Sequence, residues 1–362
     1  MSVRQIASAL KISPSTVSLA LRNSDKIPAA TRDRIIRQAD SIGYRPNAKL
    51  KEVMSQLRHV HDRPVDSCFG VVSLYDTLRP WEGSEHHARI FDSMQHRASQ
   101  LGYRLEPLLL TEPGMTHRRF KSILDARGIQ GLLCFGSPNL NDVFPSDLST
   151  YAIVTTGLSI ETPLHRVTAH FYNDVTHVLQ KVHALGYRRP GLVLGRYEDR
   201  RSAHAYVGAY LAWCEDLFGD SVAPVLRVDR VEEAPLLEWL GSNDLDVIIL
   251  VHLSGVIQDF QQVLSKNGIR APEDIGIAAV TQILDGTGLS GTEQDQELIG
   301  SWAVELLVSR IMNQDFGIPE NPRIELVESH WVDGTSLRNQ PIRNVTPARL
   351  RTNPSPRLAA SA

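Results

Sequence analysis

The sequence has little cysteine and no long apolar run. Its three cysteines, Cys68, Cys134 and Cys214, lie far apart among apolar neighbours, so we expect buried, reduced thiols and no CxxC metal or redox pair. No stretch approaches the roughly 18 apolar residues that a transmembrane helix needs, so we expect no contact with a membrane. The N-terminus also lacks the apolar segment and cleavage site of a secretory signal. These absences favour a cytoplasmic protein.

Motifs that mark common enzymes are missing as well. The sequence contains no GxxxxGK[ST], HExxH or GxSxG, and no GxGxxG at the start of a predicted helix. His86 and His87 lie near Glu82 and Glu85 and suggest a metal, but adjacent helical side chains point about 100° apart. A polar helix start is the simpler interpretation. We therefore predict no catalytic residue, no metal and no cofactor.

A small basic segment precedes a large acidic one. Residues 1–60 hold eleven Lys and Arg against four Asp and Glu, and residues 61–362 hold 27 against 37. The overall charge of −3 thus combines +7 in the first segment with −10 in the second. This asymmetry is typical of a module that binds a polyanion, attached to a body that repels polyanions.

Three short helices are predicted in the basic segment. Their apolar faces are Val3, Ile6, Ala7 and Leu10, then Val17, Ala20 and Leu21, then Ile35, Ala39 and Ile42. Only three residues separate the first two helices, and Ser13 can cap the second helix, which begins at Pro14. This pattern predicts a helix-turn-helix whose second helix lies in the major groove of DNA. A generic three-helix bundle has the same spacing and remains the alternative.

The same segment resembles a known family of DNA-binding proteins. The runs ISPSTVSLALRN (12–23), TR (31–32) and GYRPN (43–47) resemble the head of the lac repressor / galactose repressor family of bacterial transcription regulators, without gaps over roughly the first fifty residues. We therefore assign residues 1–46 to a DNA-binding head.

The resemblance implies which head residues contact DNA. It assigns base contacts to Pro14, Ser15 and Leu19, and phosphate contacts to Thr16, Ser18, Asn23 and Tyr44. Relatives often carry Arg where this chain has Leu19. An apolar side chain suits a thymine methyl group, whereas Arg suits guanine, so we do not expect the operator of a better-known relative.

Residues 47–67 follow as a hinge and linker. The resemblance implies a hinge helix that pairs with its copy in a dimer and inserts Val53 into the minor groove. Val53 is shorter than the usual Leu and Glu52 adds a negative charge near phosphates, so only a weak kink is expected. A plain helical linker is the alternative.

Residues 68–338 alternate short apolar runs with amphipathic stretches. The predicted strands are 68–74, 104–110, 131–135, 151–156, 191–194, 224–228, 247–251 and 276–280. The predicted helices are 85–101, 117–127, 174–185, 201–218, 233–240, 256–266 and 296–312. The alternation predicts an α/β fold with doubly wound parallel sheets, and so many units suit two sheets better than one. Ligands of such sheets bind at the carboxyl ends of the strands.

The resemblance extends more weakly into this region. The runs LGY (101–103), LGYRR (185–189), PEDIG (272–276) and WVDGT (331–335) are similar to the family's periplasmic-binding-protein-like sensor core. Three chain crossings in the family imply one lobe from 68–167 with 296–320 and another from 168–295 with 321–338. Residues 339–362 hold four Arg, four Pro and no acid, which indicates a disordered tail.

The effector contacts of familiar relatives do not transfer. Ala205 replaces the usual Arg before Gly208, His252-Leu253 replaces an Asn-Asp pair, and Thr281-Gln282 replaces an acid. The remaining candidates at strand ends are Asp76, Trp81, Ser137, Tyr172, Asn173, Arg201, His252 and Gln282. Trp81 either stacks on a sugar or packs in the core. Arg201 is the only Arg or Lys among these candidates, so we expect the cleft to bind an uncharged sugar or polyol.

These patterns predict a cytoplasmic, homodimeric, sequence-specific transcription regulator, most simply a repressor. Its partners are a double-stranded DNA operator with two inverted half-sites and a small effector, for which a carbohydrate is our expectation. One alternative is a solute-binding or transport component, which the basic head and missing signal oppose. The other is an enzyme on the same α/β lobes, which the missing motifs oppose.

Overall fold

The computed structural model describes most of the chain as two compact units, Met1–Val65 and Asp66–Ala362, which we treat separately. The described residues are 3–21, 27–42, 67–140, 142–145, 147–219, 225–251, 256–281 and 286–340. The predicted hinge helix with Val53 therefore lies outside the described residues, as do Asn23 and Tyr44.

The first unit contains the three predicted helices, α1 (Val3–Leu10), α2 (Pro14–Ala20) and α3 (Ala29–Ser41). The Ser13 hydroxyl oxygen accepts the Thr16 N–H at 3.0 Å, which caps α2 as its sequence predicts. The apolar faces meet in a small core built on the fully buried Ile6, Val17 and Ile35. The helix-turn-helix prediction is confirmed.

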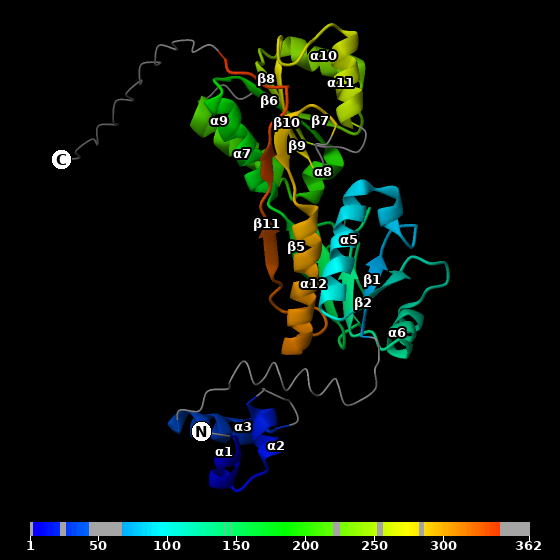
Figure 1. The fold of residues 1–362 in the computed structure, drawn as a ribbon, viewed down its shortest axis with the longest axis vertical. Coiled ribbons are helices and arrows are strands. Elements are labelled where there is room, and N and C mark those ends of the chain that lie inside the picture. Colours follow the sequence, from blue (N-terminus) through cyan, green and yellow to red (C-terminus); the bar gives the residue numbers. More distant parts are fainter. Residues whose placement is uncertain are drawn as a thin grey trace, which may run out of the picture. The chain divides into compact units, whose positions relative to one another are not determined.

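The second unit has two lobes, each built on a six-stranded sheet (Figure 1). The first sheet is parallel throughout, in the order β11-β5-β4-β3-β1-β2. Its strands are β1 (Cys68–Ser73), β2 (Arg104–Leu109), β3 (Gly131–Cys134), β4 (Ala152–Thr156), β5 (His165–Ala169) and β11 (Ile324–Val327).

The second sheet has the order β12-β10-β9-β8-β6-β7, and only β12 is antiparallel to its neighbour. Its strands are β6 (Pro190–Gly195), β7 (Leu226–Val228), β8 (Val247–Val251), β9 (Gly276–Thr281), β10 (Ser290–Glu293) and β12 (His330–Val332). The predicted pair of doubly wound parallel sheets is confirmed.

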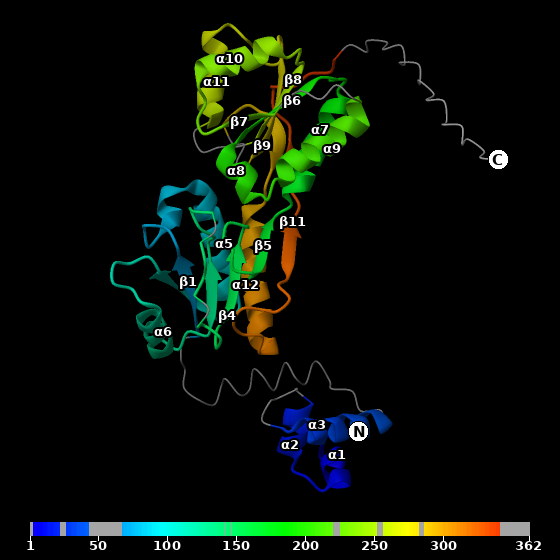
Figure 2. The ribbon, with the colours of Figure 1, turned by 180° about the vertical axis from the view of Figure 1, so that it is seen from behind.

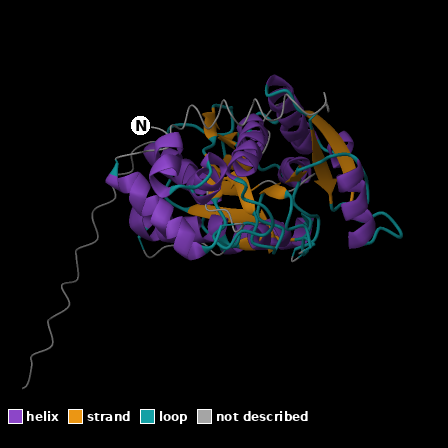
Figure 3. Ribbon diagram, turned by 90° about the horizontal axis from the view of Figure 1, so that it is seen from below, coloured by secondary structure: helices purple, strands orange, loops and turns teal. Residues whose placement is uncertain are grey.

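Helices cover both faces of each sheet, so the inner strands are buried on both sides (Figures 2 and 3). The first lobe holds η1 (Pro80–Gly83), α5 (Glu85–Gln100), α6 (His117–Ala126) and α12 (Gln296–Asn313). The second lobe holds α7 (Phe171–Ala184), α8 (Arg196–Arg201), α9 (Ala205–Phe218), α10 (Glu233–Ser242) and α11 (Val256–Lys266). None of these described helices is both long and apolar enough to cross a membrane.

Helices α5 and α12 pack closely because α12 carries a glycine at their contact. A Cβ atom on Gly300 would lie 2.3 Å from the carbonyl oxygen of Ile90, so a side chain at this position would force the helices apart. This contact places the start of α12 beside α5, next to the point where the chain crosses between the lobes.

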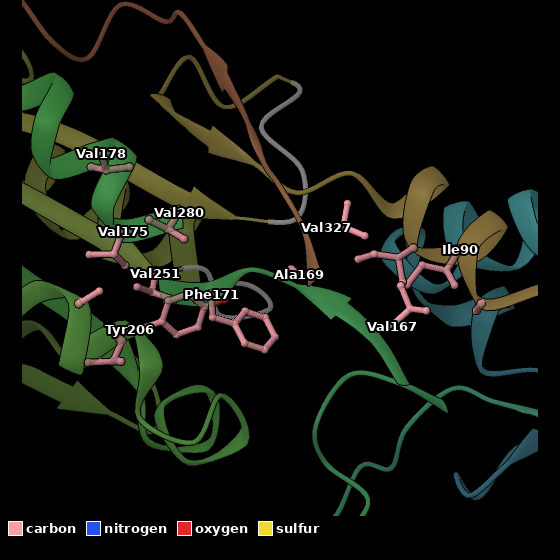
Figure 4. Close-up of a cluster of buried hydrophobic side chains, with 14 of the residues drawn as sticks. Ile90, Val167, Ala169, Phe171, Val175, Val178, Tyr206, Val251, Val280 and Val327 are labelled. Atoms are coloured by element: carbon pink, nitrogen blue, oxygen red, sulfur yellow. The ribbon is translucent and has the colours of Figure 1, made fainter. Parts of the chain in front are cut away.

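The chain crosses between the lobes three times, after β5, after β10 and after β11. One apolar cluster continues through these crossings: Figure 4 shows Ala169 and Val327 between Val167 of the first lobe and Phe171 and Tyr206 of the second. The cluster joins the two lobes where the chain crosses between them.

The structure corrects three sequence predictions. Strand β11 pairs with β5, so the third crossing follows Val327, and the assignment of all of 321–338 to the second lobe is wrong. The helix predicted for 201–218 begins later, as α9 at Ala205, because a separate helix, α8, ends at Arg201. Gln340 donates its N–H to the Leu185 carbonyl at 2.8 Å, so the chain still packs on the second lobe there. The rest of the predicted tail, from 341, lies outside the described residues.

Candidate functional site

The start of α2 presents hydroxyl groups that are already paired with one another. Ser13 Oγ lies 2.9 Å from Ser15 Oγ and 2.8 Å from Thr16 Oγ1. Pro14 and Ser15 are exposed and Thr16 is half-buried. Exposed hydroxyls at a helix N-terminus can bind phosphate oxygens or base edges, as the sequence predicts for this helix.

Leu19 lies one turn further along the same helix. It is half-buried and packs against the core of the head, so its side chain is divided between core and surface. The Ser18 side chain is outside the described residues.

A polar cavity of about 170 Å³ lies between the two lobes of the second unit. The first lobe contributes Tyr75, His86, His87, Phe135, Ser137 and Thr168, the second contributes Phe171, Tyr197, Glu198 and Arg201, and the crossings contribute Ala169 and Gln294. Because both lobes supply its walls, anything bound in the cavity contacts both of them.

Arg201 reaches the cavity because the chain bends sharply after it. Ala203 (φ 53°) and His204 (φ 62°) adopt left-handed backbone conformations that end α8 at Arg201 before α9 begins. The Arg201 guanidinium lies over the Phe171 ring, 5.5 Å from its centroid. Among the described residues it has neither a hydrogen-bond nor a salt-bridge partner, so its N–H donors remain available for a ligand.

Two buried oxygen atoms in the cavity wall also have no partner within the described part of the chain. They are Thr168 Oγ1, at the end of β5, and Glu198 Oε2, on α8. Burial raises the pKa of Glu198. Buried polar atoms are almost always hydrogen-bonded, so these two oxygens, which belong to residues of the cavity wall, are exceptions.

His87 and Tyr75 form a third polar group on the first lobe. Their Nε2 and Oη atoms lie 3.3 Å apart. Burial, reinforced by the charge of Arg201, lowers the pKa of His87 to about 4, and burial raises the pKa of Tyr75 to about 12. Both side chains are therefore uncharged at neutral pH.

Ser137 connects the two lobes through its backbone. Tyr197 Oη donates to the Ser137 carbonyl at 3.0 Å, and Ser137 N–H donates to Ser159 Oγ at 2.8 Å. The Ser137 hydroxyl donates to the Asp142 carboxylate. Ser137 thus lines the cavity with groups that already have protein partners.

The structure brings only some of the predicted effector residues together. Ser137 and Arg201 line the cavity, whereas Asp76, Trp81, Tyr172 and Asn173 do not. His252 and Gln282 lie outside the described residues.

The four predicted residues that do not line the cavity have other surroundings. Trp81 is 9% exposed and stacks on Phe91 with ring centroids 3.9 Å apart, which is the core packing that we named as the alternative. The Asn173 amide donates to Glu328, Tyr172 is 41% exposed, and Asp76 is exposed.

Sequence reasoning missed Thr168, Glu198 and Gln294. Thr168 lies on β5 and Gln294 follows β10, two strands that no apolar run predicts. Glu198 lies on α8, a six-residue helix that the sequence analysis does not predict. Prediction of the short polar strands β5 and β10 would have indicated Thr168 and Gln294.

A two-lobed core around a polar cavity, with a helix-turn-helix unit before it, defines a class of protein that binds both DNA and a small molecule. Residues 2–47 match the family described as "Bacterial regulatory proteins, lacI family", and residues 179–337 match the "Periplasmic binding protein-like domain". The chain therefore has a lacI-family helix-turn-helix domain and a periplasmic-binding-protein-like domain.

Curated proteins and solved structures are similar to the chain over most of its length. The chain is 22% identical to the sucrose operon repressor of Shigella flexneri, covering 76% of this chain and 82% of the repressor. It is 23% identical to the transcriptional repressor CytR of Escherichia coli K12, covering 87% and 91%. The fold is similar to that of the transcriptional regulator CelR in complex with cellobiose, with 20% identity, a TM-score of 0.56 and coverage of 93% and 99%. The lac repressor bound to ONPG gives 16% identity and the same TM-score and coverage.

Proposed function

We propose that this protein is a transcription repressor that binds operator DNA through its head and a small uncharged carbohydrate in the cavity between its lobes. The observation that carries the ligand half is a set of polar groups on cavity-lining residues that have no hydrogen-bond partner among the residues that the structure describes: the Arg201 guanidinium, Thr168 Oγ1 and Glu198 Oε2. Relatives named for sucrose and a neighbour bound to cellobiose support the choice of a carbohydrate.

The charge balance of the cavity favours a neutral polyhydroxy ligand. One guanidinium and one carboxylate offset each other, and His87 is neutral. Arg supplies several N–H donors and a carboxylate accepts several, so the pair can bind neighbouring hydroxyl groups of a sugar. The rings of Phe135 and Phe171 supply apolar walls for its C–H faces.

Ligand binding regulates DNA binding through the arrangement of the lobes. A ligand that contacts both lobes stabilises the arrangement in which those contacts are made, and the equilibrium shifts by the difference in its affinity for the two arrangements. By reciprocity, operator DNA alters the affinity for the sugar by the same factor.

The protein acts in the cytoplasm as a homodimer on two inverted half-sites, and it catalyses no reaction. A single helix-turn-helix buries too little surface for tight specific binding, whereas a two-fold dimer reads a palindrome. Analytical ultracentrifugation should show a dimer at micromolar concentration. Monomers both with and without DNA would contradict this part of the proposal.

The ligand is identified by thermal shift against a panel of sugars. The panel contains sucrose, cellobiose, D-glucose, D-galactose and D-xylose, with D-gluconate and D-glucose 6-phosphate as anionic contrasts. A ligand at 100 times its Kd stabilises the protein by about 2.7 kcal/mol, which is readily detected. Selection of sites from random DNA then gives the operator. Binding of only the anionic compounds would reject the uncharged ligand, and recovery of no DNA motif would favour a plain solute-binding protein.

A further inference from the structure

A buried carboxylate lies directly behind the cavity wall. Asp174, in the first turn of α7, is fully buried, and its Oδ1 atom has no partner among the described residues. Its Oδ2 atom accepts a hydrogen bond from Gln294 Nε2 at 2.8 Å. Gln294 itself lines the cavity and belongs to the second crossing between the lobes. Asp174 therefore contacts a residue that faces the ligand, although it does not face the ligand itself.

The hydrogen bonds of Gln294 determine which end of its amide is available. Nε2 donates to Asp174 and also to Tyr206 Oη, at 3.1 Å. A primary amide has two N–H donors, so both are used by protein groups. The carbonyl oxygen is the part of the amide left for a ligand, and it can only accept a hydrogen bond.

Protonation of Asp174 reverses this preference. A neutral carboxyl group carries an O–H, which donates best to the Gln294 carbonyl oxygen, and the Tyr206 hydroxyl can rotate to donate to the same oxygen. The amide then turns by about 180° about its last torsion, an easy sp³–sp² rotation. Its two N–H groups now face the cavity.

We propose that Asp174 is a positioning residue that sets the polarity of Gln294: ionised Asp174 makes Gln294 an acceptor in the cavity, and protonated Asp174 makes it a donor. The ionised form selects a ligand hydroxyl at this position, and the protonated form selects an ether or carbonyl oxygen. Only this choice of ligand group rests on the proposed function, since the coupling of the two side chains does not require a ligand.

The surroundings of Asp174 bring this switch near physiological pH. Burial raises the pKa of Asp174 to about 6, while the hydrogen bond from Gln294 opposes the rise. The charge of His170 lowers the pKa and that of Glu328 raises it, and these two residues pair with each other at 2.8 Å. From α9, the group that faces Asp174 is the buried Tyr206, which is itself influenced by Arg201 and Glu198.

The test follows the side-chain amide of Gln294 by NMR in the full-length protein labelled with ¹⁵N-glutamine. The Gln294→Glu variant identifies its signals by removing them. In the wild-type protein we expect the Gln294 signals to shift with a single midpoint between about pH 5 and 7. In Asp174→Asn, which keeps the shape but cannot ionise, this titration should disappear.

Two further variants make the result specific. Asp199→Asn removes a different buried carboxylate, one that binds Arg227, and should leave the Gln294 titration unchanged. Glu328→Gln removes a negative charge that raises the pKa of Asp174, so the midpoint should move to lower pH, which keeps the proposal testable even should Asp174→Asn fail to fold. Gln294 signals that are flat with pH in the wild type, or that titrate unchanged in Asp174→Asn, overturn the proposal. Neither result bears on whether sugars bind, which the thermal-shift panel decides.

Discussion

The polar groups of the head and of the interlobe cavity differ in exposure and in hydrogen bonding. At the start of α2, the hydroxyls of Ser13, Ser15 and Thr16 lie within hydrogen-bond distance of one another on an exposed surface. In the cavity wall, Thr168 Oγ1 and Glu198 Oε2 are buried without a partner in the described part of the chain. An exposed site exchanges water for DNA at little cost, whereas a buried site leaves groups unsatisfied until its ligand arrives.

This difference determines which interactions set the affinity of each site. The head is a basic surface, so contacts with phosphates and the release of counterions dominate its affinity for DNA. The cavity pairs one guanidinium with one carboxyl group between two lobes, so its affinity depends on individual hydrogen bonds. The following predictions test this contrast, from the largest effect to the smallest.

Salt should weaken DNA binding strongly and sugar binding hardly at all. If the two heads of a dimer contact about 6–10 phosphates, operator affinity falls by roughly 10³–10⁵ between 50 and 200 mM salt. Fluorescence anisotropy with the selected operator measures this, and calorimetry with the panel sugar supplies the comparison. A salt-independent operator affinity would contradict the role assigned to the basic head.

Replacing Arg201 by Ala should weaken sugar binding about 10- to 100-fold. A hydrogen bond to a charged group is worth about 1.5–3 kcal/mol, and each 1.4 kcal/mol is a factor of ten in Kd. The neighbouring Arg200 does not line the cavity, so Arg200→Ala is the matched control and should bind the sugar as the wild type does. Equal effects of the two variants would show that the cavity is not the binding site.

Replacing Leu19 by Arg should redirect the head toward guanine at one position in each half-site. A bidentate Arg–guanine contact is worth about 1–3 kcal/mol of discrimination. Thr16→Ala should instead weaken binding to all selected sites alike, because phosphate contacts carry no sequence information. Site selection from random DNA separates these outcomes, and an unchanged motif with Leu19→Arg would mean that Leu19 does not face the bases.

The buried carboxylate should give the sensor core a pH-dependent stability. The pKa of Asp174 is raised to about 6 in the folded protein against about 3.9 unfolded, so its contribution to stability is complete below pH 4 and lost as the pH rises through 6. The free energy of unfolding of the wild type, relative to Asp174→Asn, should therefore fall by about 1–2 kcal/mol between pH 5 and 8. Urea unfolding at several pH values measures it, and a constant difference would exclude a titrating Asp174.

The same contrast explains how much the sequence predicts. The head could be predicted in detail because its helices are local: Ser13 caps α2, and the apolar residues that define the core lie at helical spacing. The two parallel sheets could be predicted because their inner strands are continuous apolar runs, such as Val247–Val251.

The cavity could be predicted only in part, because distant segments assemble it. Strand β5 reads HRVTA and β10 reads SGTE, so neither shows an apolar run, yet both are buried. Trp81 is a candidate effector contact by sequence because it is an aromatic residue in a loop. Its stacking on Phe91 is a tertiary contact that residue spacing does not predict. The position of Arg201 in the sequence predicts that it lies in the cleft. The left-handed turn that follows it, at Ala203 and His204, contains no glycine, so the sequence does not predict that turn.

The most direct test of the central claim measures operator affinity with and without the panel sugar, in the wild type and in Arg201→Ala. If the cavity between the lobes controls the head, the sugar changes the operator Kd of the wild type, and the variant binds the operator equally well but no longer responds at the same sugar concentration. A variant that keeps the full response, or a wild type whose operator Kd is the same with and without a sugar that demonstrably binds, would contradict the account.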